Sequence, residues 1–368
     1  MHIRRLSLHQ IRRFDSVELA PQPGINLITG DNGAGKTSVL EAIHLMGYGR
    51  SFRGRVRDGL VRQGAEALEV FVEWREGDAG RSRRAGLRHG GQDWQGRLDG
   101  AQVTQLGDLC AALAVVTFEP GSHGLVSGGS EPRRRLLDWG LFHVEPDFLR
   151  LWRRYARALK QRNALLKTGA GDTQLDAWDQ ELGDVGEPLT RHRREYLDRL
   201  EPRLRDESTE LLPAGGKASL EFVPGWRQEE LSLLDALLLA RERDRAHGFT
   251  SIGPHRADWR ITHAEIPGRD ALSRGQAKLT TLSLLLAQAG LHAALRQEWP
   301  VVLLDDLASE LDRKHQQRVL ARLLASGAQV FLTGTDFPPA LTTLGAPANV
   351  FHVEQGIIRA EATPSAGT

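Results

Sequence analysis

Residues 30–37 read GDNGAGKT, which matches the phosphate-binding pattern of Gly, any four residues, Gly, Lys and then Ser or Thr. Residues 24–29 form an apolar run that suits a buried strand, and residues 38–46 carry apolar side chains at helical spacing. Glycines let backbone N–H groups point into such a loop, where they and the helix N-terminus hold an anion. The stretch therefore predicts a strand, a phosphate-binding loop and a helix; a glycine-rich turn that matches by chance is the alternative.

The loop also predicts roles for single side chains. Lys36 is expected to neutralise the β- and γ-phosphates of a nucleotide, and Thr37 to place its hydroxyl on Mg²⁺. The other residues expected to contact the nucleotide are Gly30, Asp31, Asn32, Gly33, Ala34, Gly35 and Ser38.

Two further stretches fit phosphate chemistry. Residues 272–276 read LSRGQ and precede an apolar helix, and residues 301–306 read VVLLDD, an apolar strand that ends in two carboxylates. Such a strand can place an acid beside a phosphate-binding loop, where the acid holds Mg²⁺ through water, and this predicts a metal role for Asp305. Each stretch alone is a weak signal. All three in this order form the motif set of an ABC-type ATPase, and a small-molecule kinase has no use for residues 272–276.

Composition limits the class of protein. A chain of 368 residues is long enough for two lobes, and its net charge of +1 means that any nucleic-acid surface must be local. The single cysteine, Cys110, rules out an internal disulfide and fits a reducing cytosol. No signal peptide is evident, and no stretch approaches about 18 uncharged apolar residues, so we expect a cytoplasmic protein with no membrane span.

Arginine clusters are the candidates for such a local surface. Four arginines stand in residues 49–57, and a second cluster in residues 81–88 is expected on loops of a β lobe. We predict that the first cluster contacts DNA, although a solvated face is the common alternative for a charge run. Arg12 and Arg13 precede the loop strand and either reach the nucleotide or remain in solvent. The predicted DNA contacts are Arg50, Arg53, Arg55 and Arg57.

Periodicity divides the chain into lobes. From Glu145 to about Leu212 the pattern is almost all helical, with a break at residues 169–171, and this predicts an inserted helix pair. Residues 253–258 read GPHRAD and form a turn without the ligand spacing of a metal site. We expect an ATPase lobe built from residues 1–130 and 246–360, a helical lobe from residues 131–245, and a tail from residues 361–368.

The motifs together resemble the RecF family of DNA replication and repair proteins, short relatives of SMC-type ATPase heads. The likeness covers most of the chain. Besides the three motifs it rests on residues 49–53 (GRSFR), 133–139 (RRRLLDW), 253–258 (GPHRAD) and 304–312 (LDDLASELD). The resemblance implies an α/β fold: an ABC-type P-loop ATPase head with an inserted helical lobe.

The resemblance also implies a mechanism. Such proteins bind ATP and Mg²⁺ and form a head-to-tail homodimer on ATP, in which the signature residues Ser273, Gly275 and Gln276 act across the interface. Lys36 and Asp305 match catalytic positions, Asp306 matches the position of the catalytic base, and Asp312 matches the acid of the D-loop. The dimer would clamp single-stranded, duplex or gapped DNA in gap repair and the SOS response, assisting recombinase loading with RecO- and RecR-like partners.

Three departures from the usual pattern favour a slow, DNA-stimulated ATPase that acts as a switch. Asp306 is one methylene shorter than the usual Glu, no Gln follows the strand that ends at Phe118, and Thr333 or Thr335 replaces the switch His. The rival function is the ATPase subunit of a membrane transporter, but transporter heads keep a much shorter interval between Thr37 and Leu272. A structural SMC protein needs long heptad repeats, which this chain lacks.

Overall fold

The computed structural model describes residues 1–56, 59–77, 80–169, 171–268 and 271–361. The chain forms two compact units, one from Met1–Ser122 with His292–Thr368, the other from His123–Leu291. Arg57, one of the predicted DNA contacts, lies outside the described residues, as does nearly all of the predicted tail.

The first unit contains a mixed sheet in the order β14-β13-β3-β12-β11-β8. Five of its strands are parallel, and β14 pairs antiparallel with β13 at one edge. Every residue of β3, β8, β11 and β12 is buried, as expected for a parallel sheet covered on both faces. The bounds are β3 Ile25–Thr29, β8 Val115–Phe118, β11 Val301–Leu304, β12 Val330–Thr333, β13 Ala348–Glu354 and β14 Ile357–Glu361.

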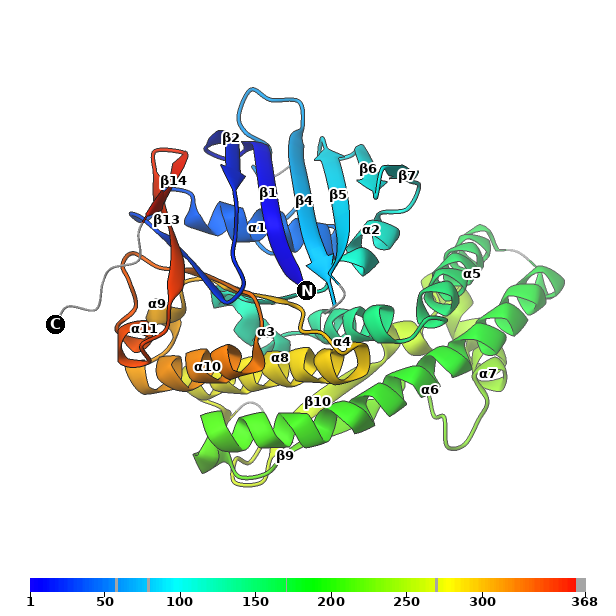
Figure 1. Ribbon diagram of the computed structural model, residues 1–368. Coiled ribbons are helices and arrows are strands. Elements are labelled where there is room, and N and C mark those ends of the chain that lie inside the picture. The colour runs from blue at the N-terminus through cyan, green and yellow to red at the C-terminus, as the bar shows by residue number, and fades with distance from the viewer. Residues whose placement is uncertain (57–58, 78–79, 170, 269–270, 362–368) are drawn as a thin grey trace. The chain divides into compact units, whose positions relative to one another are not determined.

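The same unit holds an antiparallel sheet in the order β2-β1-β4-β5-β6-β7 (Figure 1). Burial alternates along its strands, so one face is apolar and the other is polar. The expectation of loops for the second arginine cluster was wrong, because Ala85, Leu87 and His89 alternate as buried residues and make this stretch the strand β5. The bounds are β1 His2–Ile11, β2 Phe14–Leu19, β4 Leu68–Glu76, β5 Arg81–His89, β6 Trp94–Leu98 and β7 Ala101–Val103.

Helix α1 (Lys36–Tyr48) contacts both sheets of this unit: β1 and β4 of the antiparallel sheet, and β8 and β12 of the mixed sheet. Ten of its residues are buried, so it is covered on nearly all sides. Helix α2 (Leu106–Ala112) contacts α1, β6 and β7, and the strand after it begins only at Val115. The remaining helices of the unit are η1 Pro120–His123, which ends at the first residue of the second unit, α9 Leu307–Glu310, α10 Arg313–Ser326 and α11 Pro339–Thr343.

The second unit is mainly helical. Helices α5 (Phe148–Thr168) and α6 (Asp172–Leu211) pack on each other and are separated at the predicted break. Inside the unit, Arg162 is fully buried and pairs with Asp179 and Asp244 at 2.5 and 2.7 Å. The other elements are α3 Gly124–Ser127, α4 Ser130–Val144, η2 Pro213–Gly215, β9 Ala218–Val223, α7 Leu233–His247, η3 Pro254–Arg256, β10 Asp258–His263 and α8 Arg274–Arg296, whose last residues belong to the first unit.

The unit boundaries differ from the expected lobe boundaries. Residues 246–291, expected in the ATPase lobe, belong to the helical unit. The physical reason is pairing: β10 forms an antiparallel ribbon with β9, and β9 packs on α6. A return to β-type sequence therefore does not mark a return to the ATPase sheets.

Candidate nucleotide-binding site

The loop between β3 and α1 requires glycine at two positions by close approach. Gly30 has φ 138°, and a Cβ there would lie 2.3 Å from the carbonyl oxygen of Val353. Gly35 has φ 125°, and a Cβ there would lie 2.9 Å from Phe14 Cζ. Gly33 faces open space but has φ 79°, a conformation that L side chains rarely adopt. Close packing against Val353 and Phe14 therefore explains why the loop needs glycine at positions 30 and 35.

A hollow of about 450 Å³ lies beside this loop, a size that suits a small ligand. It opens at the carboxyl ends of β3, β11 and β12, where ligands bind in sheets of parallel strands. The described residues that line it are Arg12, Arg13, Asn32, Gly33, Gly35, Lys36, Thr37, Ser38, Arg53, Gly59, Pro120, Asp305, Asp306 and Thr333. The structure therefore brings together most of the residues predicted to contact nucleotide or metal.

Lys36 lies folded over the loop. Its Nζ donates hydrogen bonds to the carbonyl oxygens of Gly30 at 2.6 Å and Asp31 at 2.9 Å. An ammonium group has three N–H donors, so one remains for an anion at the loop. Lys36 is also the first residue of α1, where unpaired backbone N–H groups and the helix dipole favour negative charge.

Asp305 is the centre of a hydroxyl cluster at the ends of the strands. Its Oδ1 accepts hydrogen bonds from Thr37 Oγ1 at 2.9 Å and from Thr333 Oγ1 at 2.8 Å. Only 2% of Asp305 is exposed, and this burial raises the pKa of its carboxyl, while the Thr333 and Thr37 hydrogen bonds and the charge of Arg53 oppose the rise. A hydroxyl beside a carboxylate is the hard-oxygen donor set that Mg²⁺ prefers.

The metal-binding potential of this pair depends on further oxygen ligands. Among the described residues, no group of three or more His, Cys, Asp or Glu side chains could hold a metal ion. Mg²⁺ usually keeps several waters and takes one or two protein oxygens together with substrate phosphates. Thr37 and Asp305 fit that mode of binding, and they would hold the ion against the phosphates of a bound nucleotide.

Asp306 has a different environment from Asp305. It is exposed, lies in the left-handed region at φ 51°, and accepts a 2.6 Å hydrogen bond from Ser309 Oγ. Its backbone N–H donates to Thr333 Oγ1 at 2.8 Å. Thr333 therefore joins both aspartates and lines the hollow, whereas Thr335 bonds Asp336 and does not line it. Of the two threonines, Thr333 is the one in contact with the site.

A partly buried ion pair supports the wall of the hollow, and it was not predicted from the sequence. Arg12 donates from Nε and Nη2 to the two carboxylate oxygens of Glu41 at 2.8 and 2.9 Å. Glu41 is fully buried on α1 and also accepts a hydrogen bond from Ser51 Oγ. Ser51 Oγ in turn accepts from the backbone N–H of Arg53 at 2.9 Å. The sign of this ion pair in the sequence was Glu41, an acid among the apolar residues of the stretch 39–43.

The arginines of residues 49–57 do not share one location. Arg53 lines the hollow, and its charge acts on Asp305. Arg50 is half-buried and Arg55 is exposed, and neither lines the hollow. A single role for the whole cluster is therefore too simple.

The signature residues lie in the second unit, at the N-terminus of α8. The backbone N–H of Ser273 donates to Gln276 Oε1 at 2.9 Å, and the backbone N–H of Gln276 donates to Ser273 Oγ at 3.2 Å. This reciprocal pair is a capping box. Ser273 and Gly275 are exposed, so the helix N-terminus presents donors to solvent. Asp312, in the first unit, caps α10 and accepts from His315 Nδ1 at 2.7 Å.

Known proteins resemble this chain along its whole length. The family model described as RecF/RecN/SMC N terminal domain matches residues 2–359. A protein of Stenotrophomonas maltophilia named DNA replication and repair protein RecF is 68% identical over 97% of this chain and 99% of its own length. A protein of the same name from Xanthomonas axonopodis pv. citri is 66% identical over 99% of this chain and 100% of its own length.

Solved structures agree with these relatives. Structures of the recombination mediator protein RecF with ATP and with ATPrS, both from the RecFOR pathway, superpose with TM-scores of 0.88 and 0.85. Each is 26% identical and covers 98% of both chains. An SMC head, 15% identical with a TM-score of 0.61, shares the fold. The expected α/β fold, an ATPase head with an inserted helical lobe, is confirmed. Nothing in these relatives supports a transporter ATPase, and none of the described helices is long and apolar enough to span a bilayer.

Proposed function

The chain belongs to the RecF family of DNA replication and repair proteins, and we propose that it is an ATP-switched DNA-binding protein of recombinational repair. The single observation that carries this proposal is the convergence of Lys36, Thr37 and Asp305 on one hollow. These three residues come from the first turn of α1 and from the end of β11, which are far apart in the sequence.

The nucleotide is ATP, the ligand named for a RecF structure of the same fold. Backbone N–H groups of residues 30–38 and the N-terminus of α1 hold its β- and γ-phosphates, and Lys36 neutralises part of their charge. Mg²⁺, held by Thr37 and Asp305, supplies further neutralisation of the phosphates. Arg12 and Arg53 extend the positive wall of the hollow, and Glu41 fixes the direction of Arg12.

Hydrolysis of the bound ATP is slow, and its rate sets how long the ATP-bound state lasts. Asp306 is the candidate to accept a proton from the attacking water, because it is exposed beside Asp305 and its backbone is fixed by Thr333. Its side chain is one methylene shorter than that of the usual Glu, and a hydrogen bond from Ser309 holds it. Both features place the carboxylate less favourably for proton transfer, which needs direct hydrogen-bond reach.

ATP binding drives assembly of a homodimer. The exposed N-terminus of α8 presents Ser273, Gly275 and Gln276 as an anion site. In the dimer, this site caps the γ-phosphate bound by the other subunit, and Asp312 lies at the subunit interface. Dimer formation is therefore linked to ATP by mass action.

DNA is the partner of the dimer, with no preference for base sequence. Arg50, Arg55 and Arg57 keep their predicted role as phosphate contacts, whereas we reassign Arg53 to the nucleotide because it lines the hollow. We place this activity in the cytoplasm, in keeping with the single cysteine of the chain. RecO- and RecR-like proteins are the proposed partners, because structures of the same fold are described as part of the RecFOR pathway.

Sedimentation velocity tests the proposal. The purified chain is run without nucleotide, with ADP and with ATP, each with and without a gapped duplex. We expect a monomer in the first two states and a DNA-bound dimer only with ATP. A chain that stays monomeric in ATP and ignores DNA would overturn the proposed function.

A further inference from the structure

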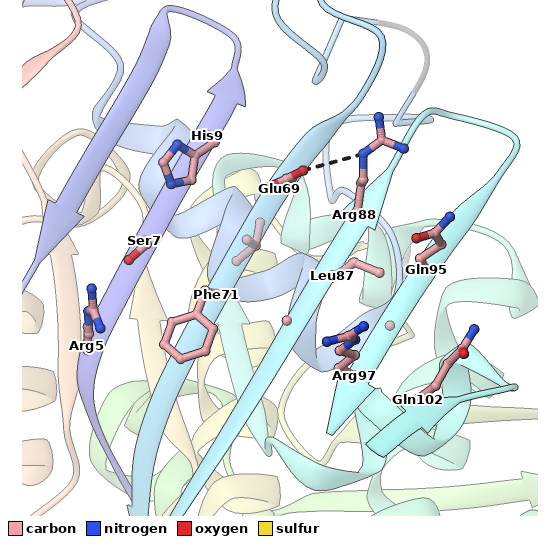
Figure 2. A pocket seen from close by; sticks show the side chains of 13 residues that line it. Arg5, Ser7, His9, Glu69, Phe71, Leu87, Arg88, Gln95, Arg97 and Gln102 are labelled. Atoms are coloured by element: carbon pink, nitrogen blue, oxygen red, sulfur yellow. Dashed lines mark ion pairs between the residues drawn. The ribbon is translucent and has the colours of Figure 1, made fainter. Parts of the chain in front are cut away.

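The polar face of the antiparallel sheet carries a second hollow, of about 650 Å³. The apolar face of this sheet packs on α1 and α2, so the hollow lies on the opposite side of the sheet from these two helices. Side chains from β1, β4, β5, β6 and β7 line it, as Figure 2 shows. The nucleotide site shares none of these residues.

Strand register explains why this face is hollow. Ser7, Phe71, Gly86, Arg97 and Gln102 stand opposite one another in a row across five strands. Phe71 has a large side chain, whereas its two neighbours in the row, Ser7 and Gly86, are small. A Cβ added at Gly86 would lie 3.9 Å from the Phe71 ring. The ring therefore lies beside bare backbone, half-exposed, in the middle of a polar surface.

Positive charge flanks the ring. Arg97 is exposed and forms no ion pair with the residues that the structure describes. Arg88 pairs with Glu69 at 3.4 Å, but both side chains are about half exposed (Figure 2). Arg5 pairs with Glu18 and lies 5.7 Å from the centre of the Phe71 ring. Exposed ion pairs of this kind contribute little to stability, so each arginine can readily exchange its carboxylate partner for another anion.

The neutral side chains of the hollow add hydrogen-bonding groups. Gln95 and Gln102 are exposed at the β6 and β7 end, and His9 is exposed at the β1 end. The row from β1 to β7 spans about 19 Å, from four intervals of about 4.8 Å between neighbouring strands. The hollow is therefore long, cationic, lined with donors and acceptors, and centred on one aromatic ring.

We propose that a single strand of DNA lies across this face, with a base stacked on Phe71 and phosphates held by Arg88 and Arg97. Aromatic side chains beside a positive groove are the common means of binding unpaired strands, because every unpaired base offers a stacking face. A duplex offers no such face to a ring in a hollow. The inference rests on the proposed function, since it names the part of a gapped substrate that this sheet binds.

Fluorescence anisotropy with a labelled oligothymidylate of about 20 nucleotides tests this assignment on the full chain. We expect Phe71→Leu to weaken binding at least about fivefold, and Phe71→Trp to retain it, because only the second keeps a stacking surface. Arg97→Ala should lower the slope of log affinity against log salt by about 0.7, the value for one phosphate contact on a single strand. Glu69→Gln should strengthen binding, because it removes the negative charge nearest the strand.

The matched control is Arg359→Ala, which removes the same charge from the exposed edge strand β14 of the other sheet and should change nothing. A wild-type chain that binds the oligonucleotide, with Phe71→Leu and Arg97→Ala binding equally well, would overturn the assignment and leave the proposed function standing. Equal weakening on intact duplex would also overturn it. A wild-type chain that binds no DNA in any nucleotide state would overturn both.

Discussion

Thr37 Oγ1 donates a 2.9 Å hydrogen bond to Asp305 Oδ1, joining the first turn of α1 to the end of β11. The two residues are 268 positions apart in the chain, and the parallel sheet alone brings them together. Both have the oxygen chemistry of a magnesium ligand, and both line the hollow beside the phosphate-binding loop.

Thr37→Ala should lower the affinity for ATP in the presence of Mg²⁺ by about tenfold or more, because the variant has no hydroxyl to offer the metal. Thr37→Ser keeps the hydroxyl and should retain most of the affinity. Calorimetric titration with and without EDTA measures the difference. If Thr37→Ala bound ATP like the wild type in both conditions, Thr37 would have no metal role.

Lys36→Ala and Lys36→Arg should abolish ATP-dependent dimerisation and DNA retention while the fold remains intact. Lys36 supplies charge at the loop, and a hydrogen bond to a charged group is worth about 1.5–3 kcal/mol. Arginine does not fit because Nζ bonds two loop carbonyls at short distance. Sedimentation with ATP, beside a thermal melt that checks folding, is the measurement. A dimer formed by either variant would remove Lys36 from the mechanism.

Glu41→Gln should destabilise the protein by about 2–4 kcal/mol, because Arg12 then loses its charge partner in a partly buried position. Urea unfolding gives the free energy. A double-mutant cycle with Arg12→Gln separates the pair from the two single changes. Additive effects of the two changes would show that the pair contributes nothing beyond its members.

Stability should fall on mild acidification, partly through His44. Burial lowers the pKa of His44 to about 3, and its Nδ1 lies 2.8 Å from Thr117 Oγ1. The unfolded chain has the ordinary pKa of about 6.5 and binds a proton that the folded chain excludes, so stability is lost as pH falls below about 6.5. His44→Gln should reduce the loss of stability between pH 7.5 and 5.5 by about 1.4 kcal/mol. Urea unfolding at both pH values would contradict this account if wild type and variant lost the same amount.

Salt dependence separates the arginines of residues 49–57. Replacing Arg50, Arg55 and Arg57 by Ala should lower the log–log slope of duplex binding by about 0.9 for each DNA phosphate that is no longer neutralised. Arg53→Ala should instead weaken ATP binding, because Arg53 lines the nucleotide hollow. An unchanged slope in the triple variant would place the duplex-binding surface elsewhere.

The ATPase core could be predicted because its signals are local. The glycines at positions 30, 33 and 35 stand between a strand and a helix, and the two carboxylates directly follow β11, so pattern and context agree. Parallel strands then bring their carboxyl ends to one edge, which is a property of the fold and needs no further information.

What the sequence did not show depends on contacts between distant residues. The bond between Arg12 and Glu41 joins a turn to a buried helix position, and no spacing rule connects the two. In the sequence, nothing distinguishes Arg53 from the neighbouring arginines. In the structure, its backbone N–H donates a hydrogen bond to Ser51 Oγ, and its side chain lines the hollow. The row around Phe71 arises from strand register across five strands, one of which was expected to be a loop.

In the proposed dimer, ATP is held between two copies of the chain, with Lys36 of one copy and Ser273 of the other at each site. Two variants, Lys36→Ala and Ser273→Arg, are each labelled in separate batches with a donor and with an acceptor dye, and the batches are combined so that every pairing contains both dyes. A dimer of either variant with itself has two defective sites, but a dimer of Lys36→Ala with Ser273→Arg has one intact site. We predict energy transfer with ATP and DNA when the two variants are mixed with each other, and none when either variant is mixed only with itself. An absence of transfer between the two variants, under conditions where labelled wild-type subunits pair, would show that Lys36 and Ser273 do not share a site across the dimer.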